Sequence, residues 1–336
     1  MSVAEIPATM RALEMRDTKF EPGSLVLVDR PVPKPGPSEV LVRVIAANVN
    51  PSDLMFLRGM YGVSRPLPTV PGFEGVGVVV AAGGALGRLL VGRRVATGAQ
   101  TSDGTWAEYL VAPALGCIPL RDRIPDDQGA SFLVNPFSAW GLYDTARGDG
   151  HRAAIHTAAA SAVGRMLVHI SKRERFPMIH VVRRPAQVEL LRGLGAEHVL
   201  LSTDDDFQQK LHALSHQLNA TAAFDAVAGP MSGMLLHAMP RGAEVYVYGA
   251  LSEAPCQFDP RDLIFQGKRV RGWWLAEFLR RPDRAVRALA SVPALYDEGM
   301  ATPIRGRYPF SKAWEALTAY QADMSAGKVL LVPDPK

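Results

Sequence analysis

Between residues 153 and 251 the chain alternates short apolar runs with longer amphipathic runs. The short runs have the length and β-branched content of buried strands: AAIHTA (153–158), MIHVVRR (178–184), HVLLS (198–202), AAFDAVAG (222–229) and GAEVYVYGAL (242–251). The longer runs place apolar residues at helical spacing: SAVGRMLVHISKR (161–173), PAQVELLRGLG (185–195) and DDDFQQKLHALSHQLN (204–219). Strands that alternate with helices of this length predict an α/β fold with a doubly wound parallel sheet.

The first third of the chain has a different pattern, rich in glycine, proline and β-branched residues. Four segments have the character of strands separated by turns: 24–49, GVGVVVAAGG (75–84), RRVATG (93–98) and TWAEYLVAP (105–113). This pattern predicts an all-β region, and a small barrel is the arrangement that we expect.

A chain of 336 residues suits two domains. Residues 126–147 place acidic side chains before apolar residues at helical spacing, which predicts a helix after the β region. After Trp274 we expect two helical stretches and a closing strand, KVLLVP (328–333), that returns to the first domain. The expected domains are therefore residues 1–125 with 276–336, and residues 126–275.

The charge and cysteine content excludes several classes of protein. The 37 basic and 33 acidic residues are spread along the chain, so we expect no nucleic-acid partner. The densest basic cluster, RRPDRAVR (280–287), is either a solvated helix face or a landing site for an acidic partner. Cys117 and Cys256 form no CxxC pair, which argues against a structural zinc site and a disulfide framework. With no signal-like or membrane-spanning apolar run, we expect a cytoplasmic protein with no membrane partner.

The turn after the first strand of the parallel sheet is where a dinucleotide pyrophosphate binds. Here it is HTAAASAVG (156–164), and only Gly164 of the G-x-G-x-x-G fingerprint remains, with Ala159 and Ser161 at the other two places. We expect the cofactor to contact Ala160, Ser161, Ala162 and Val163. The alternative is a closely packed turn without a ligand. Arg183 and Arg184 end the second strand, where an acidic residue would favour NAD, so they predict NADPH; two solvated arginines after a strand end are the alternative.

Several motifs together resemble the medium-chain dehydrogenase/reductase superfamily over nearly the whole chain. They are NVNPSDLMFLRGMYG (48–62), PGFEGVG (71–77), FLVNPFSAW (132–140), AEHVLLS (196–202) and DLIFQGKRVRGWWL (262–275). Within that superfamily they look most like the zinc-free 2-enoyl thioester reductases, with quinone oxidoreductases as the next neighbour. The resemblance implies a GroES-like β-barrel catalytic domain and a Rossmann domain that binds NADPH.

The same resemblance implies a site without a metal. Phe73 stands where the zinc enzymes have a histidine, and the NPSD segment lacks their cysteine, so no catalytic zinc is expected. Tyr61 matches the tyrosine that enoyl thioester reductases use near the reacting double bond, usually described as the proton donor. Asn50, Tyr61 and Phe73 are expected in the substrate pocket, with Asn50 and Asp53 shaping its loop. A loop aromatic with no chemical role is the alternative for Tyr61.

Other residues are assigned to the cofactor only through the resemblance. They are Asn135 beside the nicotinamide, the segment Tyr248, Gly249, Ala250 and Leu251 after the fifth strand, the aromatic segment Trp273, Trp274 and Leu275, and Lys328 near a cofactor phosphate. A turn-forming Asn-Pro, tryptophans of the core or of a dimer interface, and a solvated lysine are the alternatives. The family pairs subunits through the edge of the cofactor sheet, so segments 244–251 and 270–275 predict a homodimer.

Three functions are compatible with these features. The first is NADPH-dependent reduction of the C=C bond of 2-enoyl thioesters carried on coenzyme A or acyl carrier protein, with hydride to C3 and a proton from Tyr61 to C2. The second is an NADPH:quinone oxidoreductase or general enone reductase of the same zinc-free family. The third is a nucleotide-binding redox sensor or structural protein without catalysis, which only the degenerate phosphate turn supports.

Overall fold

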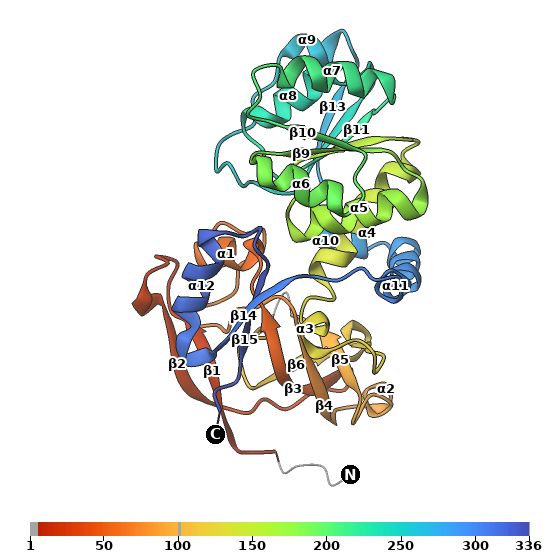
Figure 1. Ribbon diagram of the computed structural model, residues 1–336. Helices are drawn as coiled ribbons and strands as arrows, with labels where there is room; N and C mark the ends of the chain where they lie inside the picture. The colour runs from red at the N-terminus through yellow and green to blue at the C-terminus, as the bar shows by residue number, and fades with distance from the viewer. Residues whose placement is uncertain (1–5, 100–101, 336) are drawn as a thin grey trace. The chain divides into compact units, whose positions relative to one another are not determined.

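The computed structural model describes residues 6–99 and 102–335, which form two compact units (Figure 1). The first unit runs up to Val134 and takes up the chain again from Thr302, and the second unit is Asn135–Ala301. These limits differ from the expected boundaries after residues 125 and 275. Residues 126–134 belong to the first unit, where Asp126 pairs with Arg94 at 2.8 Å.

Residues 276–301 belong to the second unit rather than to the first. Arg287, on the helix α11 (Pro282–Asp297), pairs with Asp144 of the second unit at 2.8 Å. Phe278, on the helix α10 (Leu275–Leu279), packs against Trp273 with ring centroids 5.8 Å apart. These contacts keep both helices with the parallel sheet, and only the segment from Thr302 onward returns to the first unit.

The sheet of the second unit has six parallel strands in the order β10-β9-β8-β11-β12-β13 (Figure 1). The strands are β8 (Ala154–His156), β9 (Met178–Val182), β10 (His198–Leu201), β11 (Ala222–Asp225), β12 (Glu244–Val247) and β13 (Arg269–Gly272). The helices before α10 are α4 (Val134–Gly148), α5 (Ala162–Glu174), α6 (Pro185–Gly193), α7 (Phe207–Gln217), α8 (Pro230–Ala238) and α9 (Pro260–Ile264). Because the first strand, β8, lies in the middle and the order reverses beside it, this is the doubly wound sheet that the alternation predicted.

Each face of this sheet has its own apolar core. On one face Ile155, Val181 and Val245 of the strands pack with Leu211 of α7 and Leu235 of α8. On the other face a second cluster joins the strand end at Val182 to Val168 of α5 and Leu191 of α6. The alternation of side chains along each strand therefore buries both faces, as a parallel sheet covered by helices requires.

The first unit is built mainly from antiparallel strands. They are β1 (Thr9–Met15), β2 (Leu25–Pro31), β3 (Glu39–Asn48), β4 (Gly75–Ala82), β5 (Arg94–Thr97), β6 (Tyr109–Pro113), β7 (Ile118–Pro119), β14 (Ile304–Pro309) and β15 (Lys328–Val332). β1 and β2 form a pair, and the others form one sheet in which β3 joins β4, β6 and β15. Val40, Val42 and Val44 point alternately into its core with Leu110 of β6. This is the all-β region that the sequence predicted.

The helices of the first unit are short and lie at the ends of the strands. They are α1 (Pro51–Leu57), α2 (Ala85–Arg88), α3 (Asp126–Gly129) and α12 (Ala313–Ala322), with single 3-10 turns at Pro22–Ser24, Ala114–Gly116 and Phe310–Lys312. α1 and α12 pack on a second core with β1 and β15, in which Trp106 and Tyr320 are almost fully buried.

The single helix predicted over residues 126–147 is wrong, because the structure divides it into α3 and α4. The reason is a long-range hydrogen bond. One carboxylate oxygen of Glu74 accepts the backbone N–H groups of Leu133 and Val134, at 3.0 and 2.9 Å. These are amides at the start of α4 that have no partner within the helix, so Glu74 caps the helix where the sequence pattern runs on.

Among residues 6–99 and 102–335, no helix combines the length and apolar character that a membrane span needs. α11 has 16 residues and carries several charged side chains. The cytoplasmic location stays a prediction.

Candidate functional site

The carboxyl ends of the six parallel strands gather most of the residues assigned to the cofactor. Since all six strands run the same way, the segments that follow them meet at one edge of the sheet (Figure 1). These segments are 157–161 after β8, Arg183 and Arg184 after β9, Tyr248 to Leu251 after β12 and Trp273 to Leu275 after β13. The switch point between β8 and β11 is the place where this fold binds its ligand.

The turn after β8 is shaped for close approach of a helix. Ala158 adopts a positive φ of 49°, and Ser161 begins α5 by accepting the N–H of Gly164 at 3.2 Å. A Cβ atom at Gly164 would lie 2.1 Å from the carbonyl oxygen of Ala159, so only glycine fits there. Gly164 therefore does what the third glycine of the fingerprint does, although the first two are absent. Ala160, Ala162 and Val163 flank Ser161 at this helix N-terminus, where backbone N–H groups favour a phosphate.

A buried polar network that the motif analysis missed supports the same turn. The Thr157 hydroxyl donates to Asp225 at 2.8 Å and accepts the N–H of Ala226 at 2.9 Å. Asp225 also accepts the Val227 N–H at 2.9 Å and the Ser232 hydroxyl at 2.6 Å. The sequence feature that could have indicated this network is Asp225, an aspartate at the end of the apolar strand AAFD (222–225). Its bonds join the ends of β8 and β11 on the two sides of the switch point.

Tyr248 is held by His156, a partner that no sequence motif indicated. Its hydroxyl lies 2.8 Å from Nε2 of His156, and the two rings lie nearly parallel with centroids 6.0 Å apart. His156 is fully buried, and burial lowers the pKa of its imidazole far below the usual range. It is therefore neutral at physiological pH. The next residue, Gly249, lies so close to the Ala226 backbone that a Cβ atom on it would be 2.7 Å from the Ala226 carbonyl oxygen.

The remaining predicted residues of the second unit differ in exposure. Arg183, Arg184, Ala250 and Leu251 are exposed at the strand ends, and Arg184 immediately precedes α6. Asn135 is buried in the first turn of α4. Trp273 donates its indole N–H to the Thr145 hydroxyl at 3.1 Å and packs on α4, whereas Trp274 and Leu275 begin α10 half-buried. Trp273 thus makes the contacts expected for a core tryptophan, which was the alternative interpretation of this residue.

The first unit holds the other predicted residues, around the buried carboxylate of Glu74. One oxygen of Glu74 accepts the side-chain amides of Asn48 and Asn50 at 2.8 and 2.7 Å. The other oxygen caps α4 through Leu133 and Val134, as described above. Four donors therefore satisfy a carboxylate that is 0% exposed, which a buried charge requires.

Lys328 lies inside the first unit next to these acids. Its ammonium group is bonded to the Asn50 side-chain oxygen and lies 3.3 Å from the Tyr320 hydroxyl. Burial lowers the pKa of Lys328 to about 8, although Glu74 and Asp53 oppose that shift. The interpretation as a solvated tail lysine is therefore wrong. A place beside a cofactor phosphate stays a prediction.

Asp53, which was expected to shape the loop around Tyr61, hydrogen-bonds to the backbone at the start of α1 and at Phe73. Its two oxygens accept the backbone N–H groups of Asn50 at 2.7 Å and of Phe73 at 3.1 Å. Asp53 is 0% exposed, and burial raises the pKa of its carboxyl to about 7, with the charge of Glu74 adding to the effect. The residue thus joins the start of α1 to the segment that carries Phe73.

Phe73 anchors an aromatic cluster beneath Tyr61. Its ring is 4.9 Å from the Tyr61 ring and 5.4 Å from Phe56, centroid to centroid. The guanidinium of Arg65 lies over both Phe56 and Phe73, at 4.8 and 5.2 Å from the ring centroids. Arg65 also donates to the carbonyls of Val70 and Ala99, at 2.8 and 2.9 Å. These contacts fix the half-buried Tyr61 against a packed layer.

These residues do not fit a zinc site. Phe73 offers no lone pair, and both oxygens of Asp53 and of Glu74 already accept N–H groups. Over the described parts of the chain, no group of three or more histidine, cysteine, aspartate and glutamate side chains could hold a metal ion. The turn after β8 and the exposed arginines after β9, by contrast, fit a phosphorylated dinucleotide.

Two protein families match the two parts of the chain. The alcohol dehydrogenase GroES-like domain matches residues 36–122, and the zinc-binding dehydrogenase family matches residues 162–291. The mitochondrial enoyl-acyl-carrier-protein reductase of Mus musculus is 30% identical over 302 residues, which are 88% of this chain and 81% of the mouse protein.

Two solved structures are similar over almost the whole chain. A Mesorhizobium loti protein, provisionally assigned as an NADPH:quinone reductase, has a TM-score of 0.87 at 34% identity, covering 98% of this chain and all of its own. The quinone oxidoreductase of Thermus thermophilus, solved also with NADPH, has a TM-score of 0.78 at 25% identity, covering 96% of this chain and all of its own.

A GroES-like unit, a doubly wound Rossmann unit and relatives over nearly the full length confirm the fold and the resemblance inferred from the sequence. The chain belongs to the medium-chain dehydrogenase/reductase superfamily and is an oxidoreductase of its enoyl reductase and quinone oxidoreductase-like group.

Proposed function

We propose that this protein reduces the C=C bond of 2-enoyl thioesters with NADPH, with Tyr61 as the proton donor. The observation that carries the proposal is the contact between Tyr61 and Phe73, because an aromatic ring that supports a phenol stands where a metal ligand is expected. Enoyl reductases of acyl carrier protein are among the relatives, which also supports this substrate class.

NADPH bound at the strand ends would supply a hydride for C3 of the enoyl group, and the negative charge would then lie on the thioester oxygen. The chain must then supply a proton at C2. A phenol hydroxyl can act as a general acid, and the Tyr61 hydroxyl is proposed to donate this proton. Asn50 and Phe73 are proposed as its neighbours in the substrate pocket, with Asp53 fixing their backbone.

The cofactor preference is proposed to come from Arg183 and Arg184. Both are exposed at the carboxyl end of β9, where the ribose of a dinucleotide lies in this fold. A cation pair favours a 2′-phosphate over a 2′-hydroxyl. The remaining cofactor contacts are proposed for Asn135, residues 160–163, residues 248–251, residues 273–275 and Lys328.

A quinone or general enone reductase is the second candidate. The similarity to quinone reductase structures favours it, and the M. loti structure has the higher identity of the two described above. That reaction needs an open pocket beside the cofactor and depends less on a phenol. The role of Tyr61 therefore separates the two candidates.

The test is NADPH oxidation with crotonyl-CoA and with benzoquinone at matched concentration, for the wild type and for Tyr61→Phe. General acid catalysis contributes about 10²- to 10⁴-fold, so turnover of crotonyl-CoA should fall by at least about 100-fold while the KM for NADPH is kept. Tyr308→Phe is the matched control, because it also removes a hydroxyl from a half-buried tyrosine packed on the same core. Unchanged crotonyl-CoA turnover in Tyr61→Phe, or faster benzoquinone reduction by the wild type, would favour the second candidate.

A homodimer is proposed to form through β13. This strand is at the edge of the described sheet, paired with β12, and its residues are largely exposed. Ile264 and Phe265, just before it, are 69% and 65% exposed, which is unusual for large apolar side chains. Light scattering after size exclusion should give a dimer for the wild type and a monomer for Ile264→Asp. A monomeric wild type would refute this assembly.

A further inference from the structure

Two histidines stand one turn apart near the end of α7, and their imidazole rings lie together. His212 and His216 are both exposed, their ring centroids are 4.2 Å apart, and the ring planes are inclined by 28°. Residues four positions apart share one face of a helix. Imidazole nitrogens are common ligands of zinc, nickel and copper ions, and two of them at this helical spacing can hold one ion.

The packing of α7 explains why both rings face outward on a rigid support. The buried residues of the helix are Phe207, Leu211 and Ser215, and each histidine follows one of the last two by one position. One position turns a side chain by about 100° around the helix, which takes both rings off the core. The Ser215 hydroxyl donates to the carbonyl oxygen of Ala238 at the end of α8, at 2.7 Å. This bond fixes the backbone between the two rings.

The end of α7 is also closed by hydrogen bonds. The N–H of Asn219 donates to the carbonyl oxygen of His216 at 3.2 Å, and the N–H of Ala220 donates to that of Ser215 at 2.8 Å. Asn219 takes a positive φ of 50°, the left-handed conformation that ends many helices. The helix dipole places partial negative charge at this end, so a cation bound near His216 is favoured.

Neighbouring charges do not oppose a bound cation. Lys268 is buried and pairs with Asp262 at 3.0 Å, and Lys210 pairs with the two acids before the helix at 3.2 and 2.8 Å. Partial burial, the adjacent imidazole and Lys268 lower the pKa of His216. Its ring is therefore neutral at neutral pH, the form in which an imidazole can ligate a metal.

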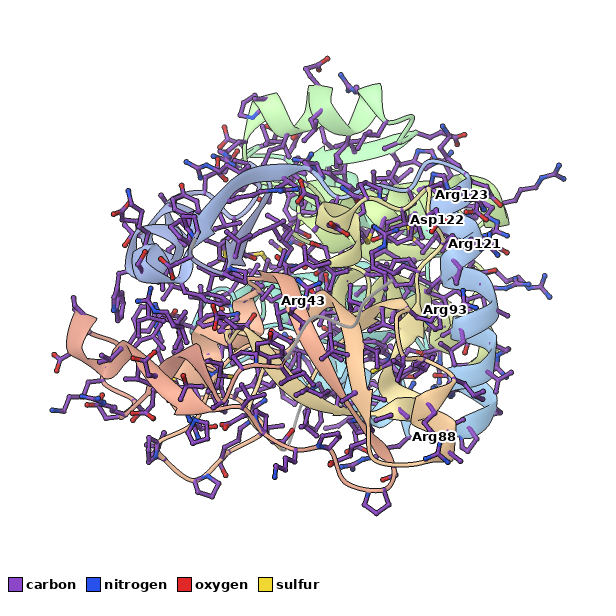
Figure 2. All side chains as sticks on the ribbon, turned by 90° about the horizontal axis from the view of Figure 1, so that it is seen from below. Arg43, Arg88, Arg93, Arg121, Asp122 and Arg123 are labelled. Carbon is purple, nitrogen blue, oxygen red and sulfur yellow. The ribbon has the colours of Figure 1, made fainter. Side chains whose placement is uncertain are left out.

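Other clusters of basic side chains differ from this pair. At 280–287 the arginines pair with acids of the same unit, as Arg287 does with Asp144 at 2.8 Å, which supports the interpretation of that segment as a solvated helix face. On the first unit, the arginines labelled in Figure 2 include Arg43 on β3 and Arg88 on α2. A guanidinium group only donates hydrogen bonds, so neither cluster can ligate a metal ion.

We propose that His212 and His216 chelate a divalent transition-metal ion, with zinc as the expected ion. Among the described residues no third histidine, cysteine, aspartate or glutamate completes the group, so water fills the other positions. Two nitrogens at about 2.0–2.1 Å from a tetrahedral zinc ion lie about 3.3 Å apart, which rings with centroids 4.2 Å apart reach by small side-chain rotations.

This site is independent of the proposed reaction. The last turn of α7 leads into the start of β11, whereas the segments assigned to the cofactor follow the carboxyl ends of the strands. The ion would therefore lie at the opposite edge of the same sheet. There it would join two successive turns of α7 and stabilise the end of this helix.

The first test is a calorimetric titration of the full-length, untagged protein with ZnCl₂, without NADPH because the cofactor phosphates bind metal ions. A second imidazole held beside the ion raises affinity by about 10²- to 10⁴-fold. His212→Gln and His216→Gln should thus each weaken binding at least about tenfold. His237→Gln, which removes an exposed histidine from α8, should not. No zinc binding by the wild type, or equal affinity in all four proteins, would overturn the proposal.

A variant with altered spacing separates the geometry of the pair from the number of histidines. His216→Gln combined with Gln217→His keeps two histidines on α7 but moves the second from four to five positions after His212, off the shared face. Both positions are exposed, so the fold should be kept, which circular dichroism checks. Zinc affinity should be as weak as in His216→Gln alone. Wild-type affinity in this variant would overturn the proposal.

Hydrogen exchange locates the bound ion. Saturating Zn²⁺ should slow amide exchange at residues 214–220 in the wild type and not in His216→Gln, because an ion bound to the folded helix opposes its local opening. Exchange at residues 157–161, after β8, should stay the same. Protection at 157–161 without protection at 214–220, or weak protection spread over the chain, would show an adventitious ion only and would overturn the proposal.

Discussion

Replacing Asp53 by asparagine should change how stability depends on pH, because this buried carboxyl titrates differently in the folded and unfolded chain. Burial raises the folded pKa from 3.8 to about 7. Folding therefore takes up a proton at Asp53 between about pH 4 and about pH 7, and the contribution of this group to stability falls as the pH rises through that window. Above about pH 7 both states are ionised and the contribution changes no further.

The size of the effect follows from the shift. About three pKa units at about 1.4 kcal/mol each give an upper value of about 4 kcal/mol. Asp53→Asn removes this titration but also costs a hydrogen bond, since the amide has one acceptor oxygen for the two backbone N–H groups of Asn50 and Phe73. That cost is about 1–3 kcal/mol and does not depend on pH. The variant should thus be less stable at about pH 5, and the gap should shrink or reverse by about pH 8.

Urea unfolding of both proteins, followed by tryptophan fluorescence at a series of pH values, measures this gap. Histidines titrate in the same range but are common to both proteins, so their effect cancels in the difference. Asp29→Asn, at an exposed position on β2 in the same unit, is the control and should keep a constant gap. A gap between wild type and Asp53→Asn that stays constant from about pH 5 to about pH 8 would refute the reasoning about burial.

Three further predictions concern buried positions. Gly164→Ala should destabilise the second unit by about 1–3 kcal/mol and weaken NADPH binding, because the added Cβ would lie 2.1 Å from the Ala159 oxygen. Calorimetry measures the stability and a cofactor titration measures the binding, and wild-type values in both would contradict the close packing. Glu74→Gln should lower the free energy of unfolding by about 1–3 kcal/mol, because the NH₂ group of the glutamine would face one pair of N–H donors. Amide exchange at the start of α4 that is slower than in the wild type would contradict the cap. His180, whose pKa burial lowers to about 4, lets stability fall as the pH drops from about 6.5 to about 4, so His180→Leu should flatten acid unfolding, and an unchanged acid transition would contradict this.

The sequence predicted the parallel sheet well, because its information is local. Each strand is a short apolar run, and the five predicted strands and the helices α5, α6 and α7 were placed to within a few residues, whereas α8 and α9 were not predicted. The need for glycine at Gly164 also followed from local geometry, since the turn between a strand and a helix leaves no room for a side chain. Residues at strand ends, such as Arg183 and Tyr248, could be placed at one edge because parallel strands all end there.

The sequence did not predict the features that depend on partners far along the chain. The break between α3 and α4 needs Glu74, which lies 59 residues before Leu133. The burial of Lys328 needs Asn50, 278 residues away. No periodicity in residues 126–147 or in the tail records these partners. Local sequence patterns therefore do not predict a buried charged residue, because its stability depends on hydrogen-bond donors that the tertiary structure supplies.

The buried charges also explain how the loop around Tyr61 can be ordered without a metal. A carboxylate in an apolar interior must be neutralised or receive several hydrogen bonds. Glu74 receives four, and Asp53 receives two while its raised pKa leaves it partly protonated. The donors include backbone amides of Asn50 and Phe73, so satisfying the charges also fixes the two segments that flank Tyr61. The same bonds that stabilise the acids thus also hold the start of α1 and the segment of Phe73, and the ring of Phe73 packs against the phenol of Tyr61.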